Sequence, residues 1–95
     1  MVALKGLGTV VAAPDGRLGL CARGTPALAV AGTGDVLAGV IGALLVEAPP
    51  FEAACAGVFL HATAGELGAI GDRGLLASEV ADHLPRALDG VRQDA

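Results

Sequence analysis

The sequence predicts an α/β fold in which short strands come first and three helices follow. Two features of the 95-residue chain indicate this order. Up to Cys21, short apolar and β-branched runs alternate with glycine and proline, which is typical of strands joined by tight turns. From Val36 onward, apolar residues recur at helical spacing. The chain has no internal repeat and no linker, so one domain is expected.

Three strands are expected before the helices. Val2–Leu4 and Thr9–Ala13 are apolar or β-branched, and the glycine-containing stretch Lys5–Gly8 separates them as a loop. Pro14–Gly16 has the composition of a tight turn. Because Arg17–Cys21 follows this turn at hairpin distance, an antiparallel pair is expected around it.

The first two helices are separated by Pro49 and Pro50. The first helix follows Asp35 and is apolar nearly all round, so it should be buried between layers. Proline ends it because proline lacks an amide proton and disfavours helix in the residue before it. The second helix is expected from Phe51 to about Ile70.

Ser78 is expected to cap the third helix, which should lie at the surface. Its apolar face would carry Val80, Leu84 and Leu88, and its solvent face Glu79, Asp82, Arg86 and Asp89. Residues 91–95, after Gly90, are expected to be a disordered tail, so the domain would span residues 1–90. An apolar strand at the start and an all-round apolar helix suggest that a larger N-terminal portion supplies the central sheet.

The composition argues against several classes of protein. Hydrophobic residues make up 54% of the chain and charged residues 17%, against about 25% in an average domain. The net charge is -4 without a Lys/Arg cluster, which disfavours nucleic acid. Cys21 and Cys55 lack zinc or disulfide spacing and are interpreted as buried apolar side chains. Ala27–Val46 is long enough to span a membrane, but Asp35 interrupts it. Without a secretion signal, the cytoplasm is expected.

The segment Gly32-Thr33-Gly34-Asp35 stands where an extended stretch turns into the first helix. Amides at a helix N-terminus attract anions, and glycine lets a phosphate approach the backbone. A carboxylate beside a bound phosphate can take a proton from a substrate hydroxyl, so Asp35 is a candidate general base. The alternative is that Asp35 only caps the helix.

Lys5-Gly6-Leu7-Gly8-Thr9 is a second candidate phosphate site, because its amides, ammonium and hydroxyl could all hold phosphate oxygens. The alternative is an ordinary turn between strands. His61 lies inside an apolar helix, where a packed, hydrogen-bonded imidazole is expected rather than a metal ligand. His83 is expected to face solvent.

Several of these segments together carry a family resemblance. In chain order they are Leu4–Val10, Pro14–Gly16, Gly32–Gly39, Phe59–Ala62 with Ala64–Glu66, and Gly74–Val80. The ordered set covers essentially the whole chain and resembles the ADP- or ATP-dependent NAD(P)H-hydrate dehydratases of the ribokinase-like superfamily. The resemblance implies a C-terminal fragment of a ribokinase-like three-layer α/β fold.

The resemblance also implies roles for particular residues. The nucleotide loop would comprise Lys5, Gly6, Leu7, Gly8 and Thr9, with Gly34 touching the nucleotide and the Thr33 and Gly34 amides forming an anion hole. Asp35 would bind the hydrated nicotinamide substrate and act as the catalytic base. The implied reaction removes water from the S form of hydrated NADH or NADPH, driven by ADP or ATP, with Mg²⁺ arriving through the nucleotide.

Two other readings remain open. A vitamin-precursor or sugar kinase of the same superfamily needs the same phosphate site and base. The chain could also be a noncatalytic piece that works only with a partner, because the family's N-terminal substrate-binding half is missing. The stretch Gly24–Ala31 also departs from the family pattern, which usually has an Asn and more glycines there. A homo-oligomer and a complementing N-terminal part are both compatible with the sequence.

Overall fold

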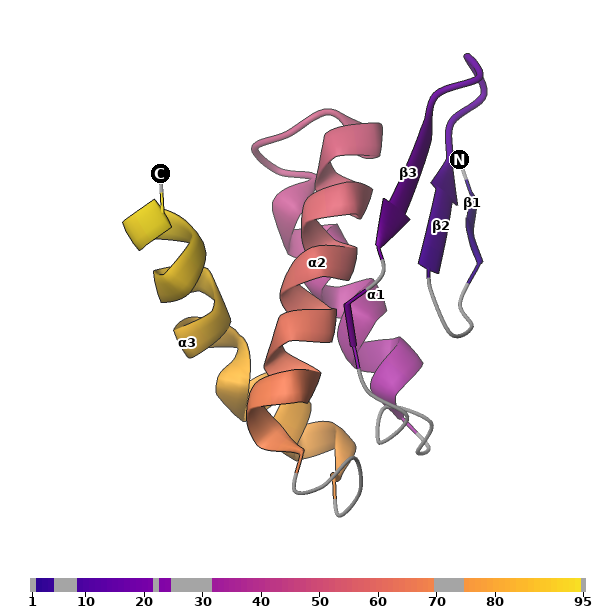
Figure 1. Ribbon diagram of the computed structural model, residues 1–95. Coiled ribbons are helices and arrows are strands. Elements are labelled where there is room, and N and C mark those ends of the chain that lie inside the picture. Colours follow the sequence, from indigo (N-terminus) through magenta and orange to yellow (C-terminus); the bar gives the residue numbers. More distant parts are fainter. Residues whose placement is uncertain (1, 5–8, 22, 25–31, 70–74, 95) are drawn as a thin grey trace.

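The computed structural model describes residues 2–4, 9–21, 23–24, 32–69 and 75–94. Its elements are β1 (Val2–Leu4), β2 (Thr9–Ala12), β3 (Leu18–Cys21), α1 (Thr33–Leu44), α2 (Pro50–Gly68) and α3 (Ala77–Asp94). The small sheet lies on one side of α1 and α2, and α3 lies on the far side of α2 (Figure 1). The expected α/β order of strands followed by three helices is confirmed.

The three strands form one antiparallel sheet in the order β1-β2-β3. The hairpin expected around the turn is therefore confirmed, with Val11 opposite Gly19 and Val10 opposite Leu20. Because side chains alternate between the faces of a strand, Val11 points into the core and is 2% exposed. Leu18 and Leu20 point the other way and are 72% and 76% exposed. One face of the sheet thus packs on the helices, and the other is uncovered.

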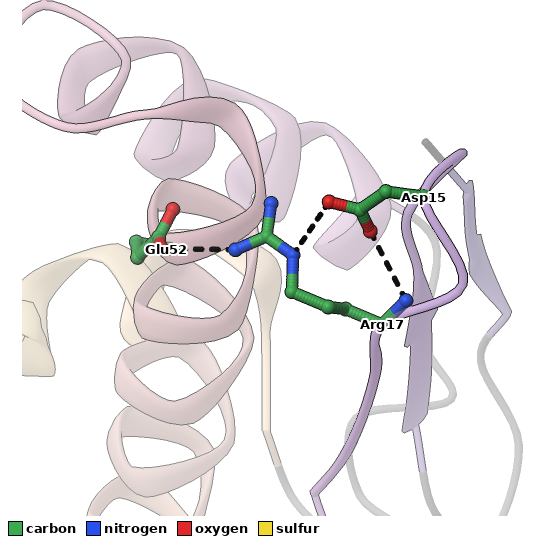
Figure 2. Close-up of polar contacts among 3 residues, drawn as sticks. All are labelled: Asp15, Arg17 and Glu52. Carbon is green, nitrogen blue, oxygen red and sulfur yellow. Dashed lines mark hydrogen bonds and ion pairs between the residues drawn. The ribbon is translucent and has the colours of Figure 1, made fainter.

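The β2–β3 turn is fixed by Asp15 and Arg17 (Figure 2). Asp15 Oδ1 accepts a hydrogen bond from the Arg17 amide at 3.1 Å, and Oδ2 accepts one from Arg17 Nε at 2.8 Å. The same guanidinium reaches α2, where its Nη1 lies 3.2 Å from Glu52 Oε1 and its centre lies 4.6 Å from the Phe51 ring centroid. One arginine therefore closes the turn and ties the hairpin to the start of α2.

This contact makes a pH-dependent contribution to stability. The amide hydrogen bond from Arg17, and then its guanidinium, hold the pKa of Asp15 below its ordinary value of 3.8. Because the folded state favours the carboxylate, the stabilisation is present above the ordinary pKa and is lost as pH falls through the lowered one. Asp15→Asn keeps an oxygen acceptor and removes the charge. We expect it to destabilise the chain at neutral pH but not in acid, as measured by urea unfolding at both. An equal deficit at both pH values would contradict this.

The helices pack closely because small residues line their contacts. A Cβ placed on Gly57 of α2 would lie 2.6 Å from Ile41 Cγ1 of α1. A Cβ on Gly19 of β3 would lie 2.7 Å from Cys55 Sγ of α2. Between these contacts lies a buried cluster of Val11, Leu37, Ala54 and Val58. A second cluster joins α2 to α3 through Leu60, Ala64, Leu75, Val80 and Ala87.

The first helix is not buried between layers, and that expectation is wrong for this chain. Within α1 only Thr33 and Leu37 are buried, and the small residues Ala38, Gly39, Gly42 and Ala43 are exposed. Just beyond the helix, Val46 is 85% exposed. The strands pack mainly against α2, so they do not cover the outer side of α1.

The third helix also differs from expectation at its two ends. It begins at Ala77, so Ser78 lies inside it, and Glu79 Oε1 instead accepts a hydrogen bond from the Leu76 amide at 2.8 Å. Glu79 is consequently half-buried rather than in solvent. The helix continues past Gly90 to Asp94, where we expected a tail without structure.

Most of the expected faces of α3 are confirmed, with two exceptions. Val80 is fully buried, while Asp82, Arg86 and Asp89 are exposed as expected. Ala87 takes the core position expected for Leu88, which is 43% exposed. His83 is half-buried against Gly68 and donates from Nδ1 to the Glu79 carbonyl at 2.7 Å, so it does not simply face solvent.

Candidate functional site

The structure describes two parts of the candidate site, the start of β2 and the N-terminal end of α1. In Figure 1 the N-terminal end of α1 lies low in the view, and the end of β1 and the start of β2 lie above it, at the lower edge of the sheet. Thr9 is the first residue of β2, and Thr33 is the first residue of α1. The antiparallel pairing of β1 and β2 brings the end of β1 next to the start of β2.

The start of α1 depends on a glycine in a left-handed conformation. Gly32 is the N-cap, with φ 93°, a region that residues with a Cβ rarely adopt. A Cβ at Gly32 would also lie 3.1 Å from the Ala77 Cβ at the start of α3. The first intrahelical bond runs from the Val36 amide to the Gly32 carbonyl, at 3.2 Å. The amides of Gly34 and Asp35 precede it and have no acceptor within the helix.

Gly34 leaves the helix end open to a ligand. No atom of the described residues outside the helix backbone lies within 4 Å of the position that its Cβ would take, and Gly34 is exposed. A phosphate oxygen could therefore approach the backbone here without meeting a side chain, and the helix dipole would favour its negative charge.

Asp35 is exposed in the first turn of α1. The alternative in which it merely caps the helix is wrong, because the cap is Gly32 and no side chain of the described residues makes a capping hydrogen bond. The carboxylate thus stands at the surface, two residues along the helix from Thr33, which is 3% exposed. An accessible carboxylate next to open amides has the arrangement needed to take a proton from a bound substrate.

The second candidate phosphate site is only partly described. Lys5, Gly6, Leu7 and Gly8 lie outside the described residues. Thr9 is half-buried and pairs with Cys21 across the β2–β3 ladder. It shares its face of β2 with Val11, the face that packs on the helices.

His61 of α2 contacts Thr33, the first residue of α1, on the buried side of the candidate site. The sequence did not reveal this contact. The expected packed, hydrogen-bonded imidazole is confirmed: His61 is 3% exposed, and its Nε2 lies 2.9 Å from the Thr33 carbonyl oxygen. A histidine within an apolar helix indicates burial, but its partner lies 28 positions away. Only the packing of α2 against α1 brings the two together.

A second link from α2 holds the residues that follow β3. Glu66 Oε1 accepts from Arg23 Nη2 at 2.8 Å, and Glu66 Oε2 accepts from the Gly24 amide at 3.1 Å. The Arg23 guanidinium also lies 5.2 Å from the Phe59 ring centroid. These contacts fasten Arg23 and Gly24, which follow β3, to α2.

Two cysteines also lie near the sheet and α2. Cys21 and Cys55 are free and half-buried, and both pack beside the Val11 cluster. Burial raises the pKa of the Cys55 thiol, which keeps it protonated near neutral pH. No three His, Cys, Asp or Glu side chains among the described residues group as a metal site. None of the helices in the described part of the chain combines the length and hydropathy of a membrane span.

Comparison with known proteins gives consistent matches. The family described as NAD(P)H-hydrate dehydratase matches residues 1–86. An ADP-dependent (S)-NAD(P)H-hydrate dehydratase of Neisseria meningitidis is 49% identical over 84% of this chain and 28% of its own. A bifunctional NAD(P)H-hydrate repair enzyme Nnr of Thermofilum pendens is 45% identical over 98% of this chain and 18% of its own.

A solved structure agrees with these sequence matches. The ADP/ATP-dependent NAD(P)H-hydrate dehydratase of Bacillus subtilis, co-crystallised with ATP and Mg²⁺, superposes with a TM-score of 0.83 at 43% identity. The match covers 90% of this chain and 32% of that one. The chain therefore spans between 18% and 32% of the length of these relatives.

Proposed function

This chain belongs to the NAD(P)H-hydrate dehydratase family, and we propose that it carries the nucleotide-binding end of an ADP- or ATP-dependent (S)-NAD(P)H-hydrate dehydratase. The observation that carries the proposal is the start of α1. There a left-handed glycine, an open Gly34 and an exposed Asp35 occur together. The cytoplasm is proposed as the place of action.

Each site residue has a distinct role in this proposal. The Thr33 and Gly34 amides form the anion hole, where they stabilise charge on the phosphoryl group during transfer. The loop of Lys5, Gly6, Leu7, Gly8 and Thr9 binds the nucleotide, and Gly34 contacts it. Asp35 binds the hydrated nicotinamide ring and is the catalytic base. Mg²⁺ is proposed to arrive with the nucleotide phosphates.

The proposed chemistry couples phosphoryl transfer to elimination. Asp35 takes the proton from the hydroxyl group of the hydrate, and the oxygen attacks the terminal phosphorus of the nucleotide. The bond from that phosphorus to the nucleotide's bridging oxygen breaks. The phosphate group then leaves the ring carbon that carried the hydroxyl group. The ring loses a proton from the adjacent atom, and this restores the double bond of NADH or NADPH.

We also propose that activity requires a complementing N-terminal portion. Leu18, Leu20 and Val46 are 72%, 76% and 85% exposed, which is unusual for large apolar side chains in one small domain. The relatives are about three to six times longer than the segment that they share with this chain. An N-terminal portion that covers the outer face of the sheet and α1 would bury these residues and supply the rest of the substrate site.

A chimaera tests the proposed function. Residues 1–86 of this chain would replace the matching segment of the Bacillus subtilis dehydratase, and the product would be incubated with hydrated NADH, Mg²⁺ and ADP or ATP. Recovery of NADH, followed by its absorbance, is the expected result, and the 95-residue chain alone should give none. If a folded chimaera phosphorylates an alcohol substrate and leaves hydrated NADH unchanged, the protein is a small-molecule kinase and the proposed dehydratase function is wrong.

A further inference from the structure

We propose that His61 is a positioning residue that aims the Gly34 amide at the bound phosphate. The inference rests on the proposed function, because it explains what orients the Gly34 amide in the proposed phosphate site. It starts from the hydrogen bond between the His61 ring and the Thr33 carbonyl, at 2.9 Å. His61 itself has no direct role in the proposed reaction.

The link between this bond and the site is the planarity of the peptide group. The Thr33 carbonyl and the Gly34 N–H belong to the same peptide unit, which is rigid and trans, so the two bonds point in opposite directions. Fixing the carbonyl oxygen therefore fixes the direction of the amide proton. Within α1 the carbonyl points along the helix toward its C-terminal end, and the Gly34 N–H points out of its N-terminal end.

The direction of the hydrogen bond is set by its acceptor. A carbonyl oxygen only accepts, so His61 Nε2 carries the proton and donates it to Thr33. A hydrogen bond accepted by the carbonyl polarises the peptide group and makes its N–H a stronger donor. His61 thus both orients the Gly34 amide and strengthens it toward an anion.

The histidine is well held for this task. It lies inside the 19-residue helix α2, flanked by the buried residues Leu60 and Ala62, and is itself 3% exposed. One turn earlier on α2, Gly57 lies directly against Ile41 of α1, which fixes the separation of the two helices. The Leu37 amide is the intrahelical donor to the Thr33 carbonyl, so His61 adds a second donor to the same oxygen from outside the helix.

Two variants of similar chemistry and different reach test the inference. The amide nitrogen of His61→Gln falls near the place of Nε2 and can donate to Thr33, whereas the shorter His61→Asn cannot reach it. Affinity of the 95-residue chain for ADP with Mg²⁺ would be measured by NMR, following the Gly34 amide resonance. We expect affinity about tenfold weaker in His61→Asn, near the contribution of one buried hydrogen bond, and within about threefold of wild type in His61→Gln.

A matched control separates positioning from general destabilisation. Val58→Ala removes buried volume from the same helix at a residue 3% exposed, in the Val11 cluster, and leaves the Thr33 contact intact. It should lower the free energy of unfolding and keep the ADP affinity of wild type. Equal ADP affinity in His61→Asn and His61→Gln would overturn the positioning role and leave the proposed function standing. If the wild-type chain shows no ADP-dependent shift of Gly34, the assigned phosphate site fails, and this inference fails with it.

Discussion

Replacing Asp35 by asparagine in the chimaera is expected to lower kcat for the dehydration by about a hundredfold to ten-thousandfold. Asparagine keeps the size of the side chain and its place in the first turn of α1, but it cannot take the proton from the substrate hydroxyl. Because the anion hole consists of backbone amides, ADP binding should persist. Steady-state kinetics with hydrated NADH would measure kcat, and calorimetry would measure the ADP dissociation constant.

Asp89 offers a control for the loss of charge alone. It is exposed on α3, so Asp89→Asn changes the net charge by the same amount without touching the start of α1. The control should retain wild-type kcat. If kcat of Asp35→Asn falls by less than threefold, Asp35 is not the catalytic base. If Asp35→Asn loses ADP binding, Asp35 belongs to the nucleotide site instead.

The substitution Gly57→Ala is expected to destabilise the packing of α1 against α2. The new Cβ would lie 2.6 Å from Ile41 Cγ1 and 3.5 Å from the Ile41 Cα, so α1 and α2 would have to move apart. Overpacking of this kind costs about 1–3 kcal/mol. Urea unfolding followed by circular dichroism would measure the loss.

The same substitution at Gly42 should have the opposite sign. Gly42 lies within α1 and is exposed, and no neighbouring atom of the described residues lies within 4 Å of its Cβ position. Alanine there gains helix propensity, which contributes up to about 1 kcal/mol. Comparing the two substitutions therefore separates the effect of helix packing on the free energy of unfolding from the effect of helix propensity. Stabilisation by both substitutions would show that α1 and α2 are not in close contact.

The elements that sequence patterns predicted well are those specified by local chemistry. Pro14 and Asp15 specify a turn through their own backbone preferences, and the hairpin formed where they indicated. The glycines around Thr33 likewise marked the start of α1 and placed Asp35 in its first turn. Local signals of this kind need no knowledge of the rest of the fold.

What the sequence could not predict depends on contacts between distant residues. The partner of His61 is 28 positions away, and no local pattern encodes that distance. Ser78 resembled a helix cap, but the Glu79 carboxylate bonded the Leu76 amide instead, so the helix began earlier. The burial of α1 was overestimated because its apolar composition says nothing about whether a layer lies on its outer side.

The uncovered outer face of the sheet gives copies of this chain an apolar surface through which they can associate in solution. Leu18 and Leu20 of neighbouring copies can meet, and mutual repulsion of the net charge of -4 is the force that opposes this. Salt at physiological strength screens such repulsion beyond about 8 Å. Added salt should therefore favour self-association, and the chain should remain monomeric most readily in dilute, low-salt buffer.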